Sequence, residues 1–197
     1  DAWTLKIPAG RFVQNTGKTL RIGQLTGKGR LGGGCTFSNG ASVGANTWQV
    51  GGDKSFTFDG TVTSGDKFNK MGTGKMTVTG LWDMTGAVTV SAGELCLNST
   101  TKGGLGIGSL TISKNATLSG NGKAYLTNSV VTVSSGGTLR SGISETSSTG
   151  NIDFGGKNVT VSGTIQTYLG SKSGFSKFSN IGTLKLNGTL KLNIREA

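Results

Sequence analysis

The side chains of this sequence that could do chemistry are few, and their types narrow what that chemistry can be. Histidine is absent from the 197 residues, and only nine residues are acidic. Without histidine, neither a serine–histidine–aspartate nor a cysteine–histidine arrangement can form. The closest acidic set is Asp53, Asp59 and Asp66, but paired carboxylates that hydrolyse glycosides must lie about 5–9.5 Å apart. Nothing in this spacing requires that, so we expect no catalytic residues, no enzyme activity and no cofactor.

The sequence predicts neither a metal site nor a disulfide for its two cysteines, Cys35 and Cys96. Two cysteines without histidine cannot make an ordinary zinc site. In a repeat of about twenty residues they lie about three rungs, roughly 14 Å, apart, whereas bridged Cα atoms lie within about 7 Å. We therefore predict free thiols and no metal site. Leu95 and Leu97 on either side predict that Cys96 points outward.

Two glycine-containing stretches match phosphate-binding patterns only in part. Gly27–Gly32 fits G-x-G-x-x-G, but a dinucleotide site needs this loop to open a helix after a strand, and no helical pattern follows. Gly17-Lys18-Thr19 is similar to the end of a phosphate loop, but Phe12 stands where the first glycine must be. Neither stretch predicts nucleotide binding.

The chain is strongly basic, with 20 lysines and arginines and a formal net charge of +11. Such a surface attracts polyanions, for example acidic polysaccharide or lipopolysaccharide. The simpler interpretation is that scattered lysines keep the chain soluble and protect its strand edges. The candidate ligand-binding residues are Lys67, Lys70 and Lys75, which form a basic group, and Trp82, whose ring could stack on a sugar.

Short runs of apolar residues alternating with threonine or serine organise most of the chain, and glycine or asparagine closes each run. Met76-Thr77-Val78-Thr79-Gly80 is one such run. Alternation bounded by turn residues predicts half-buried strands. The runs recur at intervals clustering near twenty residues, which is typical of a solenoid. Their first apolar residues are Phe56, Met76, Val88, Leu110, Val131, Val159 and Leu184.

These patterns predict an all-β fold, a right-handed single-stranded parallel β-helix of about nine rungs, with residues 1–197 as one solenoid domain. Alternate residues of each rung should point inward and stack on the next rung. The predicted inward residues are Val88, Val90, Leu95, Leu97, Leu110, Ile112, Leu118, Val131, Val133 and Leu139.

Residues 46–139 carry the strongest repeat pattern, and they resemble the autotransporter-associated β-strand repeat, also called the passenger-associated transport repeat. The matching phrases are Phe58-Asp59-Gly60, Lys70–Met76, Gly86–Val90, Gly93-Glu94-Leu95, Gly106–Ile112, Ala116–Gly122 and Gly136–Leu139. The resemblance implies a β-helical segment of a larger bacterial protein, at the outer-membrane surface or outside the cell. It implies a structural stalk or adhesin-like passenger segment, and it specifies no activity.

Two other functions stay open. One is a binding module that recognises acidic glycans or lipopolysaccharide through a basic face, and the other is a polysaccharide-acting β-helix enzyme. The partners expected are a host or bacterial surface glycan or other polyanion, and other segments of the same parent chain, with no specific nucleic acid. No apolar run approaches the roughly 18 residues that a transmembrane helix needs, and the first residues lack the features of a signal peptide.

Overall fold

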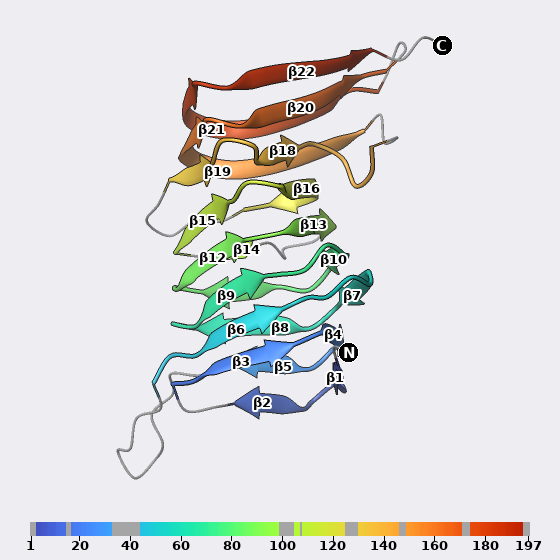
Figure 1. Cartoon of the computed structure of the whole chain (residues 1–197), viewed down its shortest axis with the longest axis vertical. Helices are drawn as coiled ribbons and strands as arrows, with labels where there is room; N and C mark the ends of the chain where they lie inside the picture. Colours follow the sequence, from blue (N-terminus) through green and yellow to red (C-terminus); the bar gives the residue numbers. More distant parts are fainter. Residues whose placement is uncertain are drawn as a thin grey trace.

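The computed structural model describes residues 3–14, 17–32, 44–98, 105–106, 108–124, 130–145, 149–170 and 174–194, and this part of the chain forms strands and no helix. The strands stack as parallel rungs along one axis, with the colour running in order from the N-terminal to the C-terminal end (Figure 1). The all-β solenoid predicted from the alternation is therefore confirmed.

One side of the solenoid, here called face A, is a continuous parallel sheet of nine described strands, in agreement with the predicted number of rungs. In stacking order these are β1 (Thr4–Ile7), β4 (Gln24–Gly27), β7 (Phe56–Phe58), β10 (Lys75–Val78), β13 (Gly93–Asn98), β16 (Ala116–Lys123), β18 (Thr138–Arg140), β20 (Thr164–Leu169) and β22 (Thr189–Ile194).

Two further faces close each rung in the first half of the chain. Face B consists of β2 (Phe12–Gln14), β5 (Arg30–Gly32), β8 (Thr61–Ser64), β11 (Trp82–Met84) and β14 (Leu105–Gly106). Face C consists of β3 (Thr19–Ile22), β6 (Thr47–Val50), β9 (Lys67–Lys70), β12 (Ala87–Val90), β15 (Ser109–Ile112), β17 (Val131–Val133), β19 (Gly150–Val161) and β21 (Ser176–Leu186). The chain visits A, B and C in turn, which gives a three-sided rung.

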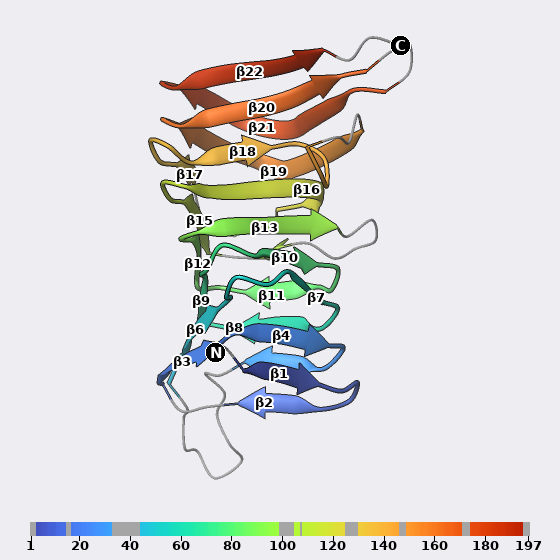
Figure 2. The same cartoon turned by 45° about the vertical axis from the view of Figure 1, so that its right-hand side comes forward.

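In the last rungs, the long strands β19 and β21 replace pairs of short strands. Each runs along two sides of the solenoid and bends between them, as Figure 2 shows near the C-terminal end. The bend in β19 falls at Gly155 and Gly156, which have φ of 59° and 81°, and β21 has Asn180 at φ 50°. Glycine and asparagine tolerate this left-handed conformation best, so the corners occur where the sequence supplies them.

The core is a single column of apolar side chains inside the rungs. All ten residues predicted to point inward are buried, each at 2% exposure or less. Their partners in the next rung are similar residues: Val88 lies beside Leu110, Leu110 beside Val131, and Val131 beside Val159. Stacked β-branched and apolar pairs of this kind stabilise neighbouring strands, which explains why the alternation alone located the core.

Candidate functional site

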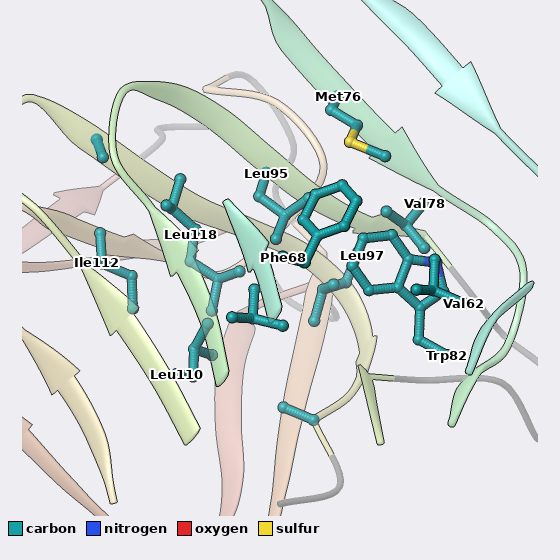
Figure 3. Close-up of a cluster of buried hydrophobic side chains, with 14 of the residues drawn as sticks. Val62, Phe68, Met76, Val78, Trp82, Leu95, Leu97, Leu110, Ile112 and Leu118 are labelled. Atoms are coloured by element: carbon teal, nitrogen blue, oxygen red, sulfur yellow. The ribbon is translucent and has the colours of Figure 1, made fainter. Parts of the chain in front are cut away.

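Trp82 is a core residue, which corrects its prediction as a sugar-stacking side chain. The strand β11 places Trp82 and Met84 inward, where both are fully buried, and leaves Asp83 exposed. The Trp82 ring packs against Phe68 with 4.5 Å between ring centroids, as the close-up in Figure 3 shows. A ring in this position is closed to a ligand from solvent, and its role is to fill the core.

The three lysines predicted as a basic group do not form one. Lys67 is exposed on β9, whereas Lys70, at the end of the same strand, is buried in the core. Lys75 on β10 is bound to Glu94, with 3.0 Å between Nζ and Oε1. Because one side chain is buried and another is paired, only Lys67 offers a free charge of the kind that a polyanion recognises.

Lys70 is held inside the solenoid by backbone carbonyl groups. Its Nζ donates to the carbonyl oxygens of Met71 at 2.8 Å, Gly72 at 3.0 Å and Ala92 at 3.2 Å. Desolvation by burial lowers the pKa of Lys70 to about 8, although the charge of Glu94 acts in the opposite direction. The three acceptors satisfy the three donors of an ammonium group, so this lysine ties two rungs together.

The acidic set considered for glycoside chemistry is also separated. Asp66 is buried and accepts hydrogen bonds from the Asn46 backbone N–H at 2.8 Å and the Trp48 Nε1–H at 2.6 Å. Asp59 is exposed and accepts a hydrogen bond from the Thr79 hydroxyl, and Asp53 is exposed as well. One carboxylate therefore faces the core while the other two face solvent.

In the part of the chain that the structure describes, the ion pairs gather around Glu94 on face A. Its carboxylate accepts from Arg140 at 2.8 Å, from Ser119 at 2.6 Å and from Lys75 at 3.0 Å, and Arg140 also reaches Glu145 at 3.4 Å. Burial raises the pKa of Glu94, but the hydrogen bonds from Ser119 and Lys75 and the Arg140 charge outweigh it and hold this pKa below its usual value. We call these five residues the Glu94 cluster.

Cys96 lies next to the Glu94 cluster and is covered by the segment of residues 141–145. Its thiol is outside the apolar core cluster, as predicted, and its Sγ lies 3.9 Å from the Ile143 carbonyl oxygen. The side chain is buried all the same, and burial raises the pKa of the thiol. Cys96 is a free cysteine, and Cys35 lies outside the described residues.

The Glu94 cluster joins rungs, and its geometry shows how. Glu94, Ser119 and Arg140 come from β13, β16 and β18, which are successive strands of face A. The Arg140 side chain is only 5% exposed, and its contact with Glu94 spans 46 positions of sequence. No sequence pattern indicated this group, because Glu94 and Arg140 become neighbours only when the chain has made two turns of the solenoid.

A shallow groove of about 490 Å³ near the N-terminal end is a second candidate. It is lined by Trp3, Arg21, Gln49 and Met71 among others, and Trp3 is 58% exposed. Arg21 Nε donates to Gln49 Oε1 at 3.0 Å, which fixes the guanidinium at the groove. An exposed indole beside a cation is suited to an acidic sugar, since the ring stacks on its apolar face.

Among the described residues, no three histidine, cysteine, aspartate or glutamate side chains gather closely enough to hold a metal ion. The same residues include no helix with the length and apolar character of a membrane span.

Comparisons with known proteins gave no match: no family model, no curated protein and no solved structure matches this chain.

Proposed function

We propose that this chain is a structural segment, a β-helical stalk or adhesin-like passenger of a secreted or cell-surface bacterial protein. The observation that supports this most is the set of contacts made by its buried and partly buried ionisable groups. Asp66, Lys70, Glu94 and Arg140 each bond to a neighbouring rung. Groups committed to such contacts stabilise a rod and are not free to act on a substrate.

The bacterial surface location rests on the resemblance of residues 46–139 to the passenger-associated repeat. The rod shape supports the same role, because stacked rungs separate whatever is attached to their two ends (Figure 1). Nine stacked strands at about 4.8 Å each correspond to a length of roughly 40 Å.

Small-angle scattering combined with a functional assay tests the stalk. We expect the scattering of a stiff elongated monomer, no shortening of acidic or neutral polysaccharides, and no change in shape when exposed Lys67 is replaced by glutamate. Depolymerisation of any polysaccharide, lost when Asp59 is changed to asparagine but kept in Asp83→Asn, would contradict a purely structural role.

The N-terminal groove favours a second candidate function, recognition of an acidic glycan. Trp3 supplies an exposed stacking surface and Arg21 a fixed guanidinium, which is the pair of groups that an acidic sugar needs. In this function the ligand binds at Trp3 and Arg21, and not at the lysines and Trp82 that were predicted from the sequence.

A glycan array read at low and at near-physiological salt tests this candidate. Selective binding that survives the higher salt and is lost in Trp3→Ala and in Arg21→Gln supports it. The matched controls are Phe175→Ala, an equally exposed aromatic residue near the other end, and Lys114→Gln, an exposed cation between β15 and β16, several rungs from the groove. Binding that is spread over every polyanion and disappears with salt, or that the controls reduce equally, assigns it to net charge alone.

A further inference from the structure

The charge of Lys70 lies directly behind the wall of the N-terminal groove. Gly51, Met71 and Gly72 line this groove. The same three residues surround the ammonium group of Lys70. Its Nζ donates to the carbonyl oxygens of Met71 and Gly72, and it lies 3.4 Å from the position that a Cβ of Gly51 would take. One layer of backbone therefore separates this cation from a ligand in the groove.

Lys70 lies inside the stack, with a described rung on either side of it. In the face C ladder it stands between Val50 of β6 and Val90 of β12. Its side chain is completely buried, and the three acceptors of its ammonium are neutral carbonyl groups. Among the described residues it forms no ion pair. A charge held in this way is weakly screened, because the protein interior has a low dielectric constant and excludes salt.

The other charged groups around the groove leave its potential positive. Glu94 acts on Lys70 from the neighbouring rung, but the Glu94 carboxylate is already bound to two cations of its own cluster. Arg21 supplies a second cation at the groove, and none of the described residues that line it is acidic. The groove is therefore bounded by two positive charges, which together suit an anionic group on the ligand.

We propose that Lys70 determines the specificity of this groove: its buried charge acts through the wall at Gly51 and selects a sugar whose carboxylate lies against that glycine. The inference rests on the second candidate function, recognition of an acidic glycan, and it adds the position of the anionic group and a dependence on pH. Lys70 does not contact the ligand, because its three donors are used within the solenoid. Gly51 has no side chain, so the carboxylate can approach the backbone closely.

The charge of Lys70 changes within a mild pH range, whereas the other charges at the groove do not. Desolvation by burial lowers the pKa of Lys70 to about 8, although Glu94 acts in the opposite direction. Arg21 and a sugar carboxylate keep their charges throughout this range. Below pH 8 the protonated lysine attracts the carboxylate, and above pH 8 the neutral amine does not. Binding of an acidic sugar should therefore weaken as the pH rises through this value.

Calorimetric titration with the trimer of galacturonic acid, at pH 6.5 and at pH 9.5 and at constant ionic strength, tests the proposal. We expect the wild type to bind the trimer roughly fivefold more weakly at pH 9.5, which is the order of effect of one charge about 8 Å away in a partly dry medium. Lys70→Met should bind equally at both pH values, as weakly as the wild type does at pH 9.5. Lys114→Met, which removes an exposed lysine several rungs away, should behave as the wild type does.

The role of Lys70 and the function of the groove fail in different ways. Binding that is lost in Trp3→Ala and in Arg21→Gln, yet is unchanged in Lys70→Met and equal at both pH values, keeps the glycan site and overturns the role of Lys70. A pH dependence that persists in Lys70→Met belongs to another titrating group, such as an α-amino group, and overturns that role as well. Absence of binding by the wild type at pH 6.5 removes the acidic-glycan function itself, and the inference with it.

Discussion

The two halves of the solenoid use the same repeat but are built differently. In the N-terminal region, residues 3–112, three short strands make each rung, whereas in the C-terminal region, residues 116–194, β19 and β21 each run along two sides. Four fully buried tryptophan and phenylalanine side chains, Trp48, Phe58, Phe68 and Trp82, lie in the described N-terminal region, whereas the described C-terminal region has one, Phe154.

This difference shows two ways to stabilise the same coil. Bulky side chains such as Trp48, Phe68 and Trp82 fill the wide three-sided interior of the N-terminal region. The C-terminal region has fewer buried aromatic residues and an apolar cavity of about 290 Å³ lined by Ile165, Leu184 and Leu190 among others, and the long backbone ladder between β19 and β21 runs along it. Core packing should therefore dominate stability near the N-terminus and contribute least at the C-terminal edge.

The largest expected effect is at the centre of the N-terminal core. Trp82→Ala removes a fully buried indole that packs on Phe68, and it should lower the free energy of unfolding by about 3–5 kcal/mol. Leu190→Ala, at the half-exposed edge, should lower it by less than about 1 kcal/mol, because little buried area is lost. Urea unfolding followed by circular dichroism measures both, and equal losses would remove the contrast between the two regions.

Substitutions at glycine corners should also cost more stability in the N-terminal region than in the C-terminal region. At Gly51, with φ 131°, a methyl group would lie 1.9 Å from the Met71 carbonyl oxygen of the next rung. Gly51→Ala should therefore lower the free energy of unfolding by about 2–4 kcal/mol, because the neighbouring backbone must shift and the alanine must adopt a strained φ. At Gly156, with φ 81°, nothing lies within 4 Å of that position, so Gly156→Ala should cost only the strain, about 1 kcal/mol. Thermal melts of the two variants give the comparison.

The alternation of apolar and polar residues was sufficient to predict the strands and the inward column of the core. The same alternation also indicates the direction of Trp82 and Lys70, but the prediction that these two residues bind a ligand did not use it. In Trp82-Asp83-Met84, the first and third residues point to the same side of the strand, the side of the core. In Phe68-Asn69-Lys70, Phe68 and Lys70 do the same. Reading the alternation through these strands would have placed both candidates in the core.

The remaining contacts depend on how many residues each turn of the solenoid contains, which the sequence pattern does not determine. Arg140 reaches Glu94 because the strands that carry them are two rungs apart on face A, and the segment that covers Cys96 follows directly after Arg140. The exposure of Leu190 and Leu192 was likewise not predictable from the alternation, because they have the same pattern as buried leucines in earlier rungs.

The buried Lys70 makes the N-terminal region sensitive to alkaline pH. Its pKa in the folded protein is about 8, lowered from 10.5. Between these values the unfolded chain keeps a proton that the folded protein has lost, so stability should rise with pH through this window, by up to about 3 kcal/mol. Below pH 8 both states carry the proton, and this contribution is absent.

Unfolding midpoints measured from pH 7 to pH 11 in three proteins isolate this contribution. Lys70→Met should abolish the rise relative to the wild type, and Lys67→Met, which changes an exposed lysine on the same strand, should keep it. Parallel pH profiles for the wild type and Lys70→Met would show that Lys70 stays charged in the folded protein.

A smaller effect than at Trp82, Gly51 or Lys70 is expected at the junction of the two regions, where the Glu94 cluster holds the segment of residues 141–145 over Cys96. Arg140→Met removes the link between Glu94 and Glu145 but leaves Glu94 with Lys75 and Ser119. We expect a loss of about 1–2 kcal/mol, because Glu94 keeps two partners and some contact with water.

Local opening of the segment is the sharper readout of this change. In a Cys35→Ser background, a neutral maleimide should label Cys96 about tenfold faster in Arg140→Met than with Arg140 present, since about 1.4 kcal/mol of lost closure corresponds to that factor. Lys185→Met, which removes an exposed cation from the C-terminal region, should leave the rate unchanged. An unchanged rate in Arg140→Met would mean that the segment is held closed without Arg140, by the β18 backbone and by the hydrogen bond that Lys75 Nζ donates to the Ile143 carbonyl oxygen.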